Sequence, residues 1–131
     1  MKIYVATSWK NAERAEALIG ALRYIGYDVY NFMENSFNWA TLETDDWFND
    51  SRVHAHYLKD LEALKTCDVL IAIFPCGNST HIEIGFVAGR GKPIIALSDA
   101  PLKRDLLYKS FEKVFMREAD LIDYMSVWRV I

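Results

Sequence analysis

The sequence contains few of the residues that mark secreted or nucleic-acid-binding proteins. Its 131 residues include two cysteines, and 15 Lys and Arg against 18 Asp and Glu give a net charge of −3. Cys67 and Cys76 have the spacing of neither a zinc knuckle nor a C-x-x-C redox pair, so we expect free, buried thiols. The weak, mixed charge disfavours binding to a nucleic acid polymer.

Long hydrophobic runs and linker-like segments are also absent. No apolar run approaches the roughly 18 residues of a membrane span, and the first residues, with Lys2 and Lys10, contain no signal-peptide core. There are three prolines, six glycines and no low-complexity tract. The sequence therefore predicts one cytoplasmic domain over residues 1–131 that makes no contact with membrane.

Short apolar segments alternate with helical patterns along the chain. Strands are predicted over 2–7, 27–32, 69–74, 94–97 and 114–116, and helices over 12–25, 52–66, 102–108 and 118–127. A further helix, capped by Ser79 or Thr80, is predicted to run to about residue 89. Every position of 69–74 is apolar, which is typical of a central strand covered on both faces. This order predicts an α/β fold: a doubly wound, five-stranded parallel sheet of the flavodoxin-like or Rossmann-like type, with helices on both faces.

Residues 33–50 form the least regular stretch, yet they contain Phe37, Trp39, Trp47 and Phe48. A polar connection across the surface has no need of four large aromatic residues. We therefore expect this segment to act as a lid over a ligand or as an interface with another subunit. An additional edge of the core is the alternative.

Ligands of open parallel sheets bind beyond the carboxyl ends of the strands. After the first strand, Trp9 offers a stacking face and Asn11 an amide for a planar base, although a surface aromatic and an ordinary helix cap are the alternatives. The candidate substrate-binding residues follow the first strand and the central strand: Ser8, Trp9, Asn11, Gly77, Asn78 and Ser79.

Glu83 has two interpretations. Thr80 and Glu83 match the capping-box pattern, in which the glutamate accepts a hydrogen bond from the backbone N–H of the cap. Alternatively, a carboxylate in the first turn of this helix lies at the rim of the cleft, where the helix dipole favours its ionised, nucleophilic form.

Asp60 is the second candidate carboxylate. It borders the apolar stripe of its helix, where a solvated acid is the ordinary alternative. Together with Glu83 it provides two carboxylates in different environments, as glycosidic bond cleavage through an oxocarbenium-like transition state requires. Tyr4, on the first strand, either holds a carboxylate in place or packs in the core.

A metal site is disfavoured. His54 and His56 lie near three aspartates, but in a helix this spacing directs the two rings to different sides. Residues 89–92 lack the strand-then-helix context of a phosphate-binding loop. We expect neither a metal nor a cofactor.

Several motifs occur together in one order. They are Ile3-Tyr4-Val5-Ala6, Ser8-Trp9-Lys10-Asn11, Lys59-Asp60-Leu61, Cys67-Asp68, Pro75-Cys76-Gly77-Asn78-Ser79, Glu83-Ile84-Gly85-Phe86 and Gly91-Lys92-Pro93. With this order and spacing, residues 1–97 resemble the nucleoside 2-deoxyribosyltransferase family. The resemblance is greatest to its short branch, often found in phage and prophage genomes.

The resemblance implies a role for each candidate. Glu83 would attack the anomeric carbon, Asp60 would handle the proton of the base, and Tyr4 would position the nucleophile. The family commonly carries another acid about six residues before the glutamate, where this chain has Gly77. The implied ligand is a small-molecule nucleoside or nucleotide, and the implied assembly is a homodimer or larger homo-oligomer.

The sequence leaves three functions open, two of them catalytic. The resemblance favours cleavage or transfer at the N-glycosidic bond of 2'-deoxynucleosides. A 2'-deoxynucleoside 5'-monophosphate N-hydrolase, which has the same fold and uses water as the acceptor, is an alternative. The other alternative is a non-catalytic nucleotide-binding module.

Overall fold

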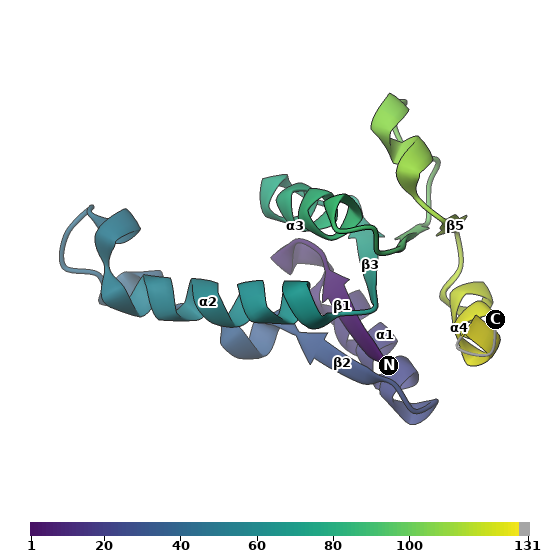
Figure 1. Cartoon of the computed structure of the whole chain (residues 1–131), viewed down its shortest axis with the longest axis horizontal. Helices are drawn as coiled ribbons and strands as arrows, with labels where there is room; N and C mark the ends of the chain where they lie inside the picture. Colours follow the sequence, from purple (N-terminus) through teal and green to yellow (C-terminus); the bar gives the residue numbers. More distant parts are fainter. Residues whose placement is uncertain (129–131) are drawn as a thin grey trace.

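Five parallel strands form one sheet in the order β2-β1-β3-β4-β5 (Figure 1). The structure is a computed structural model, and it describes residues 1–128. The strands are β1 (Lys2–Ala6), β2 (Asp28–Asn31), β3 (Val69–Phe74), β4 (Ile94–Ser98) and β5 (Lys113–Phe115). This order is that of flavodoxin-like doubly wound sheets, so the predicted fold class is confirmed.

Helices cover both faces of the sheet. They are α1 (Ala12–Tyr24), α2 (Ser51–Thr66), α3 (Asn78–Gly89) and α4 (Glu118–Trp128). On one face α1 and α4 bury Leu18 and Leu121 against the strands, and on the other α2 and α3 bury Leu64 and Val87. Because β3 pairs with β1 and β4 and all its residues are buried, it is the central strand that its sequence predicts.

Local chemistry explains where the helices begin and end. Helix α1 stops before Gly26, whose φ of 103° lies in the region that favours glycine. Helix α2 begins after Asp50, whose carboxylate accepts hydrogen bonds from the backbone N–H groups of Arg52 and Val53. Among residues 1–128, no helix combines the length and the apolar character that crossing a membrane requires.

The aromatic segment between β2 and α2 folds into short 3-10 turns. These are η2 (Phe32–Asn35), η3 (Trp39–Thr41) and η4 (Trp47–Asn49). In Figure 1 this segment and the N-terminal part of α2 extend away from the sheet. Trp47 and Phe48 are 49% and 78% exposed, so the segment does not serve as an additional edge of the core.

The predicted helix over 102–108 is wrong. The structure has only a 3-10 turn there, η5 (Leu106–Ser110). Leu106 and Leu107 are exposed, so the segment has no apolar stripe to bury against the sheet, and a longer helix gains nothing from packing. Tyr108 instead anchors the segment by packing its ring against Phe74.

Candidate active site

A cavity of about 460 Å³ opens at the carboxyl ends of β1 and β3, where the strand order reverses. Most of the predicted site residues line it: Ser8, Trp9, Asp60, Gly77, Asn78, Ser79 and Glu83. They come from the segments after β1 and β3 and from helices α2 and α3. The fold therefore brings together residues that lie as much as 75 positions apart, from Ser8 to Glu83.

Tyr4 and Glu83 are in direct contact. Tyr4 is fully buried in β1, and its hydroxyl donates a hydrogen bond to Oε2 of Glu83 on α3. The phenol therefore fixes one oxygen of a carboxylate that reaches the cavity.

The capping-box interpretation of Glu83 is wrong. Helix α3 begins at Asn78 with Gly77 as its N-cap, so Thr80 is already inside the helix and Glu83 lies beyond the first turn. The carboxylate of Glu83 accepts from Tyr4 rather than from a backbone N–H of the cap. Because of its position and its hydrogen bond from Tyr4, Glu83 does not cap the helix.

Burial raises the pKa of Glu83 to about 7, the hydrogen bond from Tyr4 opposes this rise, and the negative charge of Asp60 adds to it. The expectation that the helix dipole keeps this group ionised is therefore wrong, because Glu83 lies past the first turn and is largely desolvated. Near neutral pH both protonation states of Glu83 are populated. A group poised in this way is typical of functional sites.

Asp60 is held by two residues that the sequence did not single out. Its Oδ1 accepts from the Tyr30 hydroxyl at 2.6 Å and from Nδ2 of Asn35 at 2.8 Å. Tyr30 could have been found by aligning the two predicted strands, since it is the register partner of Tyr4 in the β1–β2 pair. Asn35 carries no sequence signal, because its position depends on the turn η2.

Side chains tie together the two segments that follow β1 and β3. The backbone N–H of Gly77 donates to Oγ of Ser8 at 2.9 Å. Asn11 donates from Nδ2 to Oγ1 of Thr7 at 2.9 Å and to the carbonyl of Pro75 at 2.7 Å. Asn11 stands at the N-cap of α1 without capping it and does not line the cavity, so its observed contacts are structural.

Aromatic rings form much of the cavity wall. Trp9 and Phe32 meet edge to face with centroids 5.6 Å apart, and Phe37 and Trp39 do so at 5.1 Å. Such walls suit a flat, partly apolar ligand such as a nucleobase. Part of the segment 33–50 therefore faces this cavity.

Metal ligation has no support within the described residues. Among residues 1–128, no group of three or more His, Cys, Asp or Glu side chains is close enough to hold an ion. The ring of His54 packs on Tyr57, whereas Nδ1 of His56 lies 2.8 Å from the carbonyl oxygen of Asn35. Burial raises the pKa of the Cys76 thiol to about 11, which disfavours its thiolate at neutral pH.

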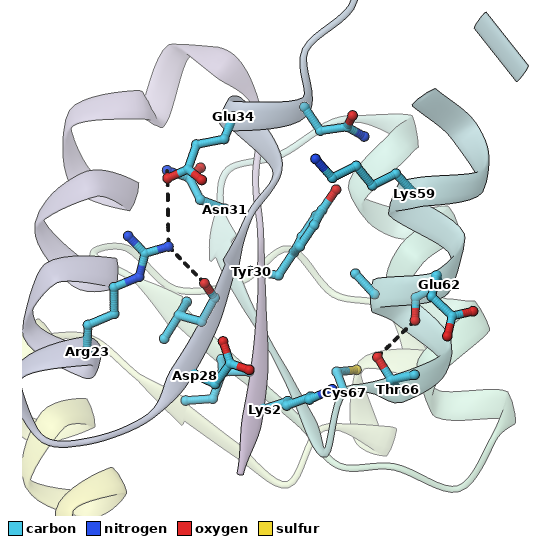
Figure 2. Close-up of a pocket in the computed structure, with 14 residues that line it drawn as sticks. Lys2, Arg23, Asp28, Tyr30, Asn31, Glu34, Lys59, Glu62, Thr66 and Cys67 are labelled. Atoms are coloured by element: carbon cyan, nitrogen blue, oxygen red, sulfur yellow. Dashed lines mark hydrogen bonds and ion pairs between the residues drawn. The ribbon is translucent and has the colours of Figure 1, made fainter. Parts of the chain in front are cut away.

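A second hollow of about 400 Å³ lies beside β2 and α2 (Figure 2). Its charged lining residues have both signs: Lys2, Arg23, Asp28, Glu34, Lys59 and Glu62. Arg23 donates to the carbonyl of Val29 at 2.9 Å and pairs with Glu34 at 3.7 Å, which covers part of the β2 edge (Figure 2). None of the predicted site residues lines this hollow.

Comparison with known proteins shows the family to which the chain belongs. The family model described as nucleoside 2-deoxyribosyltransferase matches residues 3–116. This match identifies the chain as an enzyme of N-glycosidic bond cleavage or transfer. It belongs to the nucleoside 2-deoxyribosyltransferase family, as its sequence motifs predict.

Solved structures share the fold. A 2-deoxyribosyltransferase from Bacillus psychrosaccharolyticus is 23% identical, with a TM-score of 0.77 over 95% of this chain and 92% of that one. A conserved protein from Enterococcus faecalis is 22% identical, with a TM-score of 0.71 over 95% and 96%. The CMP N-glycosidase BcmB of Clostridium botulinum is 24% identical, with a TM-score of 0.61 over 95% and 98%.

At these identities the three structures show a shared fold. No protein with a curated description matches the chain.

Proposed function

We propose that this enzyme is a nucleoside 2-deoxyribosyltransferase in which Glu83 is the nucleophile and Asp60 the general acid and base. One observation carries the proposal: Glu83, oriented by Tyr4, and Asp60, held by Tyr30, reach the same aromatic-lined cavity. Two carboxylates placed in this way meet the requirements of glycosidic bond cleavage.

The reaction divides into two displacements. In the first, a carboxylate oxygen of Glu83 bonds to the anomeric carbon while the bond to the base nitrogen breaks, and the base leaves with a proton from Asp60. In the second, an acceptor nitrogen attacks the same carbon and gives its proton to Asp60, which frees Glu83. Inversion at each step leaves the product with the configuration of the substrate.

A hydrolase is the second candidate, with water as the acceptor. Gly77 stands where the family commonly has an acid for base contact. A protein of the same fold, BcmB of Clostridium botulinum, is described as a CMP N-glycosidase, which supports this alternative. Against a 5'-monophosphate substrate, no Lys or Arg of the described chain lines the cavity, whereas two carboxylates do. This charge distribution favours an uncharged nucleoside over a phosphate dianion.

Product analysis by liquid chromatography tests these proposals. Deoxynucleosides and their 5'-monophosphates are incubated with and without a second free base, using wild type, Glu83→Ala and the exposed-glutamate control Glu16→Ala. We expect exchanged nucleoside from wild type and Glu16→Ala, and none from Glu83→Ala. Free sugar or sugar phosphate alone would identify a hydrolase, and the absence of any product would support the non-catalytic module.

We also propose that the enzyme is a homo-oligomer in the cytoplasm. Trp47 and Phe48 extend the aromatic series beyond the cavity and remain exposed, as interface residues do before association. The two free cysteines, Cys67 and Cys76, fit a reducing compartment.

A further inference from the structure

Two tyrosines on neighbouring strands link the two carboxylates of the site. Tyr4 on β1 and Tyr30 on β2 are register partners in the parallel pair, so their side chains lie on the same face of the sheet. Their rings stack with centroids 5.2 Å apart and planes inclined by 21°. The hydroxyl of Tyr4 donates to Glu83, whereas that of Tyr30 donates to Asp60.

The hydrogen bonds to Asp60 converge on one of its oxygens. Tyr30 and Asn35 both donate to Oδ1, at 2.6 and 2.8 Å. The same Asn35 amide donates to the carbonyl of His56 at 2.9 Å, which ties the turn η2 to the helix that carries Asp60. These contacts leave Oδ2 of Asp60 as the oxygen available to a ligand.

Tyr30 also lies between two hollows. It lines the second hollow beside β2, where Figure 2 shows its hydroxyl end directed toward Lys59, while its partner Asp60 lines the active-site cavity. Burial and the hydrogen bond to Asp60 raise the pKa of Tyr30 well above its ordinary value. The phenol is therefore a permanent hydrogen-bond donor over the working pH range.

We propose that Tyr30 is a positioning residue that acts through Asp60. Together with Asn35 it anchors Oδ1 and so directs Oδ2 at the leaving base, and its stack on Tyr4 sets the spacing between the acid and the nucleophile. The inference rests on the proposed function, because it assumes that Asp60 transfers the proton. General acid catalysis demands such placement, since a donor outside hydrogen-bond reach of the leaving group delivers no proton.

The test compares Tyr30→Phe, which keeps the stacked ring and removes the hydroxyl, with Tyr24→Phe on the surface. Tyr24 is 92% exposed, so its variant reports the effect of losing a hydroxyl far from the site. With a deoxynucleoside that wild type converts, we expect Tyr30→Phe to lower kcat about tenfold with KM changed less than about twofold. Tyr24→Phe keeps both constants.

A double-mutant cycle separates positioning from a general structural effect. If Tyr30 acts through Asp60, adding Tyr30→Phe to Asp60→Asn lowers the residual rate no further. The inference would be overturned if Tyr30→Phe lowered the rate by the same factor in wild type and in Asp60→Asn. A rise in KM without a fall in kcat in Tyr30→Phe would also overturn it. If Asp60→Asn has no measurable rate, the split between kcat and KM in Tyr30→Phe decides alone.

Failure of this inference differs from failure of the proposed function. An active wild type, an inactive Glu83→Ala and a fully active Tyr30→Phe would reject the role of Tyr30 and leave the proposed function intact. A wild type without N-glycosidic activity would reject the proposed function itself.

Discussion

At the scale of single residues, burial and a hydrogen bond act in opposite directions on the carboxyl group of Glu83. Burial raises its pKa to about 7 from an ordinary 4.5, while Tyr4 stabilises the ionised form. A buried nucleophile of this kind gains reactivity from weak solvation, and its ionisation lowers the stability of the fold. Both consequences can be measured.

The first prediction concerns stability. Between about pH 4.5 and 7 the folded chain keeps a proton on Glu83 that the unfolded chain has lost, so the free energy of unfolding falls as pH rises through this window. The full shift corresponds to about 3 kcal/mol. In urea unfolding, Glu83→Gln should therefore be more stable than wild type at pH 8 by a few kcal/mol and equal to it near pH 4.

Glu16→Gln, at an exposed position on α1, is the control and should change stability at neither pH. Equal stability of Glu83→Gln and wild type at pH 8 would show that ionised Glu83 costs the fold nothing.

The second prediction concerns the pH dependence of activity. The rate should rise with pH as Glu83 ionises, with a midpoint near 7. Tyr4→Phe removes the hydrogen bond that lowers this pKa, so the rise should move to higher pH by about one unit. Initial rates from pH 5 to 9 measure this shift.

Tyr124→Phe is a matched control because Tyr124 also donates to a glutamate, Glu112, at 2.8 Å, away from the cavity. Its pH profile should be that of wild type. An unchanged profile in Tyr4→Phe would separate Tyr4 from the ionisation of Glu83.

At the scale of elements, the site depends on how the segments after β1 and β3 are joined. Asn11 spans them with two hydrogen bonds from one buried amide. Replacing Asn11 removes the donor from Oγ1 of Thr7 and from the carbonyl oxygen of Pro75 in a mostly buried environment. Asn11→Ala should therefore lower the free energy of unfolding by about 2 kcal/mol.

Asn49→Ala removes a comparable amide that bonds Asp46 on the exposed surface, and it should change stability by less than about 0.5 kcal/mol. Equal effects of the two variants in chemical unfolding would mean that Asn11 does not hold these segments together.

The elements also show which features a sequence pattern can predict. The all-apolar run of β3, the spacing in α1 and the turn at Gly26 predicted strands and helices correctly, because burial on both faces and a positive φ leave clear local signals. The prediction of a helix around Leu106 was wrong because helical spacing does not show whether the fold offers a surface against which the apolar side chains can be buried.

The candidate site was partly predictable in the same sense. The sequence predicts three catalytic residues: Glu83, Asp60 and Tyr4. The fold brings them together with most of the predicted substrate-binding residues. The true start of α3 and the hydrogen bonds from Tyr30 and Asn35 to Asp60 depend on tertiary structure. Local patterns do not encode such contacts.

At the scale of the whole molecule, the exposed aromatic residues predict self-association. Trp47 and Phe48 lie in the segment that extends away from the sheet (Figure 1), and burying them against a second copy would remove large apolar surfaces from water. Light scattering coupled to size-exclusion chromatography should give at least twice the 15.1 kDa mass of one chain.

Trp47→Ala combined with Phe48→Ala should shift the protein toward a single-chain mass, whereas Leu106→Ala, which removes an exposed leucine from η5, should not. A single-chain mass for wild type at micromolar concentrations would contradict the interface.

The central claim is that Glu83 forms a covalent bond to the sugar. Its most direct test is peptide mass mapping after wild type and Glu83→Ala are rapidly quenched during turnover of a 2'-deoxynucleoside. The account predicts one deoxyribosyl group on the peptide that contains Glu83 in wild type and none in the variant. An adduct on another residue, or product formed with inverted anomeric configuration and no adduct, would contradict it.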